Sequence, residues 1–123
     1  MKNLITWFEI PAKDFKRAVN FYEKLLGHKL KIYECETEKM AFFPEKDFGN
    51  CGMISQAKGF NPSEDGVVIY FDATDNLDDL ILRTKKAGGK ILKDKCKIEA
   101  EGRGHFALVK DSEGNRIGYY SED

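Results

Sequence analysis

The chain has 123 residues, of which 41% are hydrophobic and 33% are charged, and its formal net charge is −1. This balance is typical of one globular domain that buries a core without disulfides or metal, and it argues against nucleic acid or an anionic membrane as a partner. No apolar run approaches the roughly 20 residues that span a bilayer, and the N-terminus lacks signal-peptide features. The three cysteines lie far apart, which is typical of reduced thiols. We therefore expect a cytoplasmic protein.

The first half of the chain predicts a strand, a helix and three further strands. Leu4–Ile10 is rich in β-forming residues. Asp14 is a suitable N-cap for a helix over Phe15–Leu26, which Gly27 ends. Three β-rich segments follow, namely Lys29–Tyr33, Met40–Phe43 and Cys51–Ser55. We expect the charged segment 34–39 to be a mobile coil.

The second half repeats this order. Val67–Ala73 is rich in Val, Ile, Tyr and Phe and is predicted to be a strand. Asn76 can cap a helix that carries apolar residues over Leu77–Ala87 and ends at Gly88-Gly89. Three strands are expected after it, at Lys90–Leu92, Phe106–Lys110 and Arg116–Ser121. Segment 93–104 is expected to be a charged coil.

The matching order indicates a duplication. The apolar spacing of residues 15–25 recurs at 77–87, and the turn at 46–50 resembles the turn at 110–115. One sheet with one helix leaves a sheet face uncovered, so two such units are expected to pair around a cleft. The predicted fold is α+β, with two tandem βαβββ units in a curved, partly open barrel. A single domain over 1–123 contains a first unit at 1–56, a linker at 57–66 and a second unit at 67–123.

The residues at both ends of the chain carry a family resemblance. They are an aromatic strand, a helix with a Phe-Tyr pair and a Leu-Gly end, and an acidic turn before the last strand. In the sequence these are Trp7-Phe8-Glu9-Ile10-Pro11, Asp14, Arg17-Ala18, Phe21-Tyr22, Leu26-Gly27 and Asp111-Ser112-Glu113-Gly114-Asn115-Arg116-Ile117-Gly118. This pattern resembles the vicinal oxygen chelate (glyoxalase/bleomycin-resistance) superfamily across nearly the whole chain.

The resemblance implies a divalent metal, held by His, Glu or Gln side chains on the first and last strands of each unit. In this chain the four places resemble Ile5, Met53, Val67 and Gly118. None of these residues offers a side-chain oxygen or an imidazole nitrogen to a divalent ion, and a shift of one residue brings in no His, Glu, Gln or Asp. We therefore expect the cleft without a metal and without a cofactor.

Strand alternation from those four places predicts the lining of the cleft. The lining should be mostly aromatic and aliphatic, with two charged residues, and suits a flat apolar ligand with one or two polar groups. The predicted ligand-binding residues are Trp7, Glu9, Met53, Ile69, Phe71, Arg116 and Tyr120. Glu9 could also act as a general base, with His105 as a further acid or base, or could instead pair with a cation such as Arg116.

Three functions remain open from the sequence. The first is metal-independent binding of an apolar or aromatic small molecule, as in bleomycin-resistance proteins or sensors. The second is a metal-independent isomerase or lyase that uses Glu9 as its base. The third is a vestigial cleft in a domain that binds a partner. The resemblance and the open sheet edges also predict a homodimer.

Overall fold

The computed structural model describes residues 4–45 and 51–123, and its elements follow the predicted order of two βαβββ units. The first unit contains β1 (Phe8–Pro11), α1 (Phe15–Leu26), β2 (Lys31–Glu34), β3 (Glu38–Phe42) and β4 (Gly52–Ala57). The second contains β5 (Tyr70–Asp72), α3 (Leu77–Lys86), β6 (Lys90–Lys97), β7 (His105–Lys110) and β8 (Arg116–Ser121). The predicted turn at 46–50 lies outside the described residues.

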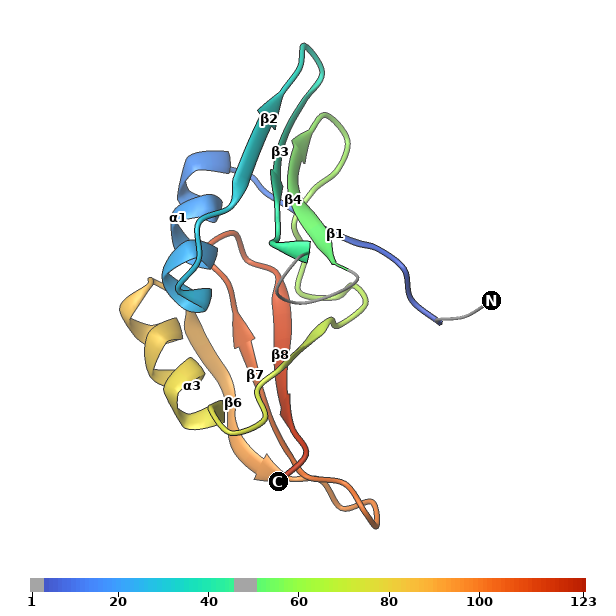
Figure 1. The fold of residues 1–123 in the computed structure, drawn as a ribbon, viewed down its shortest axis with the longest axis vertical. Coiled ribbons are helices and arrows are strands. Elements are labelled where there is room, and N and C mark those ends of the chain that lie inside the picture. The colour runs from blue at the N-terminus through green and yellow to red at the C-terminus, as the bar shows by residue number, and fades with distance from the viewer. Residues whose placement is uncertain (1–3, 46–50) are drawn as a thin grey trace.

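Each unit forms its own four-stranded mixed sheet (Figure 1). The strand orders are β1-β4-β3-β2 and β5-β8-β7-β6, so β1 and β5 occupy equivalent edges. Each of these edge strands runs parallel to its neighbour, and the other pairs are antiparallel. The α+β prediction is confirmed. Within residues 4–45 and 51–123 no strand pairing joins the two sheets, so they do not close into a barrel.

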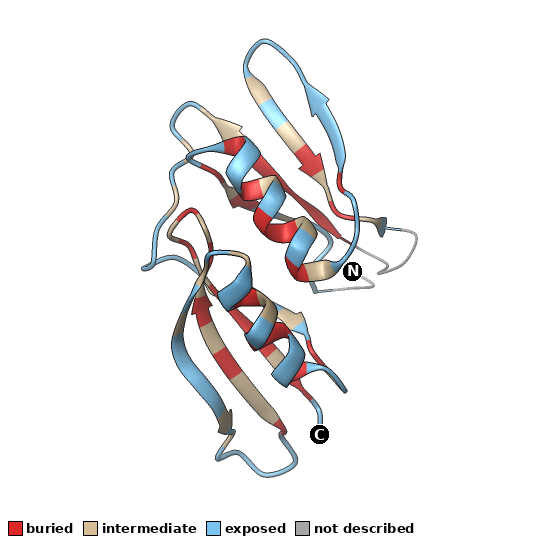
Figure 2. Ribbon diagram, turned by 90° about the vertical axis from the view of Figure 1, so that its left-hand side faces the viewer, coloured by how far each residue is buried: buried red, intermediate tan, exposed pale blue. Residues whose placement is uncertain are grey.

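Helices α1 and α3 lie on the same side of the molecule, in front of the sheets in Figure 2. Helix α1 has the predicted bounds because Asp14 accepts a hydrogen bond from the Arg17 amide at 3.2 Å, and Gly27 ends it with a φ of 73°. Asn76 precedes α3, but its side chain makes no capping bond. Arg83 of α3 donates to the carbonyl of Leu25 at 3.0 Å, which ties the two helices together.

Aromatic rings from both units share one core under the helices. Phe71 of β5 packs against four rings, with centroid distances of 6.1 to 6.5 Å. Those rings belong to Phe8, Tyr22, Phe43 and Tyr119. Because the first three come from the first unit, Phe71 joins the two halves of the core.

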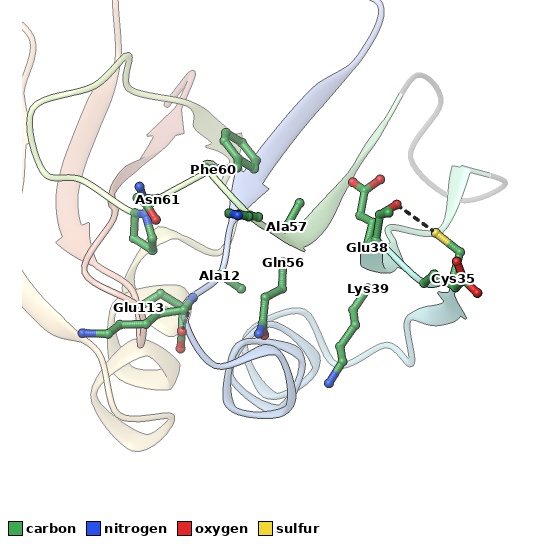
Figure 3. A pocket seen from close by; sticks show the side chains of 15 residues that line it. Ala12, Cys35, Glu38, Lys39, Gln56, Ala57, Phe60, Asn61 and Glu113 are labelled. Atoms are coloured by element: carbon green, nitrogen blue, oxygen red, sulfur yellow. Dashed lines mark hydrogen bonds between the residues drawn. The ribbon is translucent and has the colours of Figure 1, made fainter.

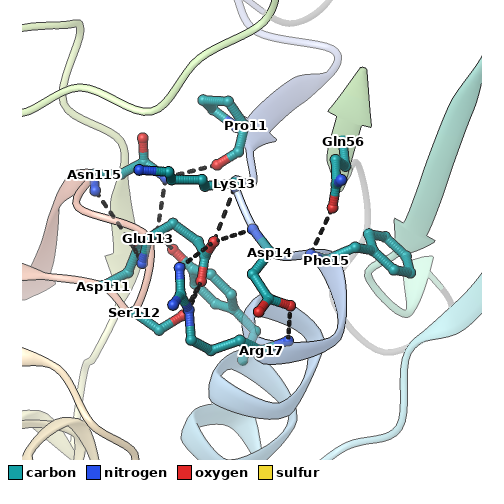
Figure 4. A network of polar contacts seen from close by, with 11 residues as sticks. Pro11, Lys13, Asp14, Phe15, Arg17, Gln56, Asp111, Ser112, Glu113 and Asn115 are labelled. Atoms are coloured by element: carbon teal, nitrogen blue, oxygen red, sulfur yellow. Dashed lines mark hydrogen bonds and ion pairs between the residues drawn. The ribbon is translucent and has the colours of Figure 1, made fainter. Parts of the chain in front are cut away.

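A buried turn of the second unit also holds the start of α1 (Figure 4). The Glu113 carboxylate accepts hydrogen bonds from the Lys13 amide at 2.9 Å, from the Asp14 amide at 2.6 Å and from Arg17 Nε at 2.8 Å. Asp111 accepts a hydrogen bond from the buried Tyr22 hydroxyl at 2.5 Å. The two units are therefore joined by polar contacts as well as by the aromatic core.

Several predicted strand bounds were wrong. Leu4–Trp7 and Val67–Ile69 precede the first strands rather than forming part of them. Each of these edge strands has only one neighbour to pair with, and pairing covers a few residues. The segments predicted as coils contain strand residues instead, since β2 and β3 reach into 34–39 and β6 extends to Lys97. Antiparallel pairing there outweighs the charged composition.

Candidate functional site

The face of each sheet opposite the helices, which we call the open face, carries the candidate site. In the first unit Glu9 of β1 pairs in register with Met53 of β4. In the second unit Tyr70 of β5 pairs with Gly118 of β8, and a Cβ at Gly118 would collide with the Tyr70 ring. A side chain at position 118 would therefore force the Tyr70 ring to move, because the ring occupies the space that a side chain would need.

The alternation predicted for the first strand of the second unit was out of phase. The prediction counted from Val67 and placed Phe71 on the cleft side. In the structure Val67 lies outside β5, and the Phe71 ring packs toward the helices with Tyr119. Tyr70, which the sequence did not single out, takes the open face. When the start of a strand is placed too early, counting from it does not determine which residues point to which face of the sheet.

A groove of about 720 Å³ runs between the two units, and we call it the inter-unit groove. Its walls come from the segment 5–11, from the linker, from the segment 66–71 and from the start of β8. Five of the predicted ligand-binding residues line it, namely Trp7, Glu9, Ile69, Phe71 and Arg116. Most of the remaining lining is aliphatic or aromatic, so the groove suits an apolar body with a few polar contacts.

The other predicted residues lie elsewhere. Met53 is buried in β4 and does not line the groove. Tyr120 lines a separate hollow of about 570 Å³ with Phe106 and Tyr70, and its hydroxyl is buried without a hydrogen-bond partner. His105 is on β7, where its Nδ1 lies 2.7 Å from a main-chain oxygen of Asp123. The structure therefore does not bring Glu9 and His105 together.

Two charged side chains of the inter-unit groove, Arg116 and Glu9, have polar atoms without a hydrogen-bond partner among the described residues. The Arg116 Nε atom is buried and has no hydrogen-bond partner. Glu9 is exposed, and across the described part of the chain its carboxylate makes no hydrogen bond or ion pair. The ion pair between Glu9 and Arg116 that the sequence allowed does not form. Both groups are free to bind something that enters the groove.

A third hollow, of about 760 Å³, is more polar, and three of its polar side chains already hold the fold (Figure 3). Gln56 accepts a hydrogen bond from the Phe15 amide at 2.6 Å, and Glu38 accepts one from the Ser55 hydroxyl at 2.5 Å. Glu113, also in its wall, holds the start of α1. A hydrogen bond with Thr37 lowers the pKa of the exposed Cys35 thiol at the rim. The inter-unit groove is the better ligand site because its two charged residues, Glu9 and Arg116, form no ion pair among the described residues.

The residues present do not fit a divalent metal of the kind that the family resemblance implies. Ile5 and Val67 lie before the strands, and the residues beside Met53 and Gly118 are Glu9 and Tyr70. One carboxylate does not make a metal centre, which needs several oxygen or nitrogen donors. Over residues 4–45 and 51–123 no group of three or more His, Cys, Asp or Glu side chains could hold a metal ion.

Comparisons with known proteins agree with this fold. The family model of the Glyoxalase/Bleomycin resistance protein/Dioxygenase superfamily matches residues 4–119. The chain belongs to this superfamily. No curated protein matches the sequence, and the similar solved structures have low sequence identity, so they show the fold alone.

Three of those structures illustrate the likeness. A glyoxalase/bleomycin resistance protein/dioxygenase family enzyme from Burkholderia phytofirmans PsJN has a TM-score of 0.70 at 15% identity, over 96% of this chain and 98% of that one. The trypanothione-dependent glyoxalase I of Leishmania major has a TM-score of 0.65 at 18% identity, over 98% and 88%. A V278E mutant of glyoxalase I from Zea mays has a TM-score of 0.71 at 20% identity, and the match covers 94% of this chain but 45% of that one.

None of the helices in the described ranges has the length and apolar character needed to cross a bilayer.

Proposed function

We propose that this chain is a metal-independent small-molecule binding protein of the cytoplasm, and that its ligand occupies the inter-unit groove. The observation that carries the proposal is a mostly apolar groove with two uncommitted charged side chains, Glu9 and Arg116. The superfamily scaffold supports it, because ligands commonly bind between the halves of such paired folds. Free thiols at the three cysteines agree with a reducing compartment.

The geometry favours binding over proton transfer. A general base normally works with a group that orients it or with a partner acid. Glu9 has no such neighbour among the described residues, and His105 lies outside the groove. We therefore do not extend the proposal to an isomerase or a lyase.

The test uses Gly66, whose replacement can fill the groove without disturbing the fold. Gly66 lines the groove, and a Cβ added to it would meet no atom within 4 Å. We expect a screen of aromatic and aliphatic small molecules to yield ligands that raise the melting temperature. Gly66→Phe should weaken them at least roughly tenfold by occupying the groove, whereas Gly66→Ala should bind like the parent.

Binding can be followed through Trp7, which is the only tryptophan in the chain and lies in the groove wall. Its single indole N–H resonance should shift on titration with each ligand. The proposal would be abandoned if the screen gave no ligand, or if every ligand bound Gly66→Phe as tightly as the parent.

We also propose that the protein forms a homodimer through the edges at β1 and β5. These edge strands have no second strand neighbour in the described residues, and unpaired edges favour pairing with another chain. Leu4 and Val67 beside them are 84% and 93% exposed, which is costly for apolar side chains in a monomer. Light scattering at micromolar concentration should give twice the monomer mass, and Val67→Asp should shift it toward the monomer. A monomer mass for the parent chain would contradict the proposal.

A further inference from the structure

We propose that the ligand of the inter-unit groove is an aromatic carboxylate, whose anionic group binds Arg116 and whose ring packs beside Trp7. This inference rests on the proposed function, and it names the class of molecule that the same groove would take.

The first step concerns Arg116, the first residue of β8. A guanidinium has five donors and is always charged, so a buried donor without a partner is costly. The Nε of Arg116 is such a donor among the described residues, and the Arg116 side chain lines this groove. A carboxylate is the natural partner, since it accepts two parallel hydrogen bonds from a guanidinium.

No acidic group in the described ranges supplies this partner. Glu64 is near enough for Arg116 to contribute to lowering its pKa, but the larger cause is a hydrogen bond from Lys110, with which Glu64 forms an ion pair. Glu9 lines the same groove and forms no ion pair with Arg116. The guanidinium therefore keeps its capacity to bind an anion.

The polar side chain of Asn115, directly before Arg116, is already used. Asn115 donates from Nδ2 to the carbonyl of Pro11 at 2.9 Å and to Asp111 at 3.0 Å. Its Oδ1 accepts a hydrogen bond from the Ser63 amide at 3.2 Å. A ligand that enters here finds a fixed structural amide and a free guanidinium, so Arg116 is the group that selects for charge.

The rest of the wall indicates a flat apolar body. Trp7 is 38% exposed, with its ring 6.1 Å from that of Phe42, and Ile69 is half-buried in the same wall. An aromatic ring packs well on such a surface. Glu9 disfavours a second negative charge on the ligand and can accept a hydrogen bond from an amino group. An aromatic carboxylate with an amino substituent meets all these features.

The experiment compares 4-aminobenzoate with 4-aminobenzamide, which has the same shape without the charge. Both are titrated into the full chain and followed by the indole N–H resonance of Trp7. We expect the carboxylate to bind at least about tenfold more tightly than the amide, since a hydrogen bond is stronger when the acceptor is charged as well as the donor.

Two variants assign the preference to one side chain. Arg116→Gln should remove the preference for the carboxylate, and Arg116→Lys should keep part of it because the charge remains while the paired geometry is lost. Arg103→Gln is the matched control, because it makes the same change in charge on a residue of the separate hollow that Tyr120 lines. It should keep the full preference.

The results separate this inference from the proposed function. Equal binding of the two probes, or a preference that survives Arg116→Gln, would overturn the inference. If neither probe bound but uncharged ligands from the screen did, the inference would fail while the proposed function stood. If Arg116→Gln bound neither probe and also lost its fold by circular dichroism, Arg116→Lys would decide, and a carboxylate preference in it as large as that of the parent would overturn the inference.

Discussion

Replacing Glu113 with alanine should lower the free energy of unfolding by about 3 kcal/mol. The side chain is fully buried and accepts hydrogen bonds from the amides of Lys13 and Asp14 and from Arg17. Truncation leaves two backbone donors of the other unit without their acceptor, and buried unpaired donors are costly. It also removes a negative charge from beside the positive end of α1. Urea unfolding of the purified protein would measure the loss.

The matched control is Glu64→Ala. Glu64 of the linker also pairs with a cation, Lys110, but its side chain is 46% exposed. Exposed ion pairs contribute about 0–1 kcal/mol, so this variant should unfold almost like the parent. A Glu113→Ala variant as stable as Glu64→Ala would mean that the turn does not hold the two units together.

The hydrogen bonds of Glu113 also predict that the free energy of unfolding depends on pH. Burial raises the pKa of the Glu113 carboxyl. The hydrogen bonds that it accepts outweigh this effect, so the pKa lies below its usual value; the donors are Arg17, Asp14, Ser112 and Lys13. A carboxyl with a lowered folded pKa stabilises the protein above its unfolded pKa, which is about 4.3. This contribution is lost as the pH falls through the folded pKa. The stability difference between the parent and Glu113→Gln should therefore shrink in acid.

The features that local rules govern could be predicted from the sequence. Helix α1 has its predicted bounds because the cap at Asp14 and the left-handed Gly27 act over a few residues. The duplication was visible because both helices carry the same apolar spacing. Strand β8 also has its predicted bounds, since the turn before it is short and well marked.

The features that depend on distant partners could not be predicted in the same way. Nothing local shows that Glu113 holds residues about 100 positions earlier in the chain. Nor does the sequence show where an edge strand begins, because this depends on how far its one neighbour pairs with it. The lining on β5 was predicted from such a strand start, which is why Tyr70 was overlooked. Met53 and Tyr120 were predicted from β4 and β8, and they lie outside the inter-unit groove because its lining comes from the segment 5–11, the linker, the segment 66–71 and residues 115–117.

Buried polar groups that are hydrogen-bonded and buried polar groups that are not have different roles in this molecule. The turn residues Asp111, Glu113 and Asn115 are buried and make several hydrogen bonds each, so they serve the fold. Arg116, directly after them, has a buried donor without a partner. Buried polar groups are nearly always paired in native proteins, and exceptions often mark function. Along the chain, the change from residues that hold the fold to a residue proposed to bind the ligand therefore falls between Asn115 and Arg116.

Replacing Phe71 with alanine should destabilise the protein by about 3 kcal/mol, whereas Tyr70→Ala should cost about 1 kcal/mol. The Phe71 ring contacts four core rings, and its removal leaves a cavity between the two units. Tyr70 is 47% exposed on the open face and covers Gly118, so water can replace much of what its ring contacts.

The order of these two effects tests the phase of β5 directly. Neighbouring residues of a strand point to opposite faces, so a shift of one residue would exchange the two costs. Urea unfolding of both variants gives the order without any knowledge of the ligand. If Tyr70→Ala proved the more damaging, Phe71 would belong to the open face, as strand alternation from Val67 predicts, and the wall of the inter-unit groove would have to be redrawn. If Phe71→Ala proved the more damaging, Tyr70 would be the residue of β5 to vary when the two hollows that it borders are compared for binding.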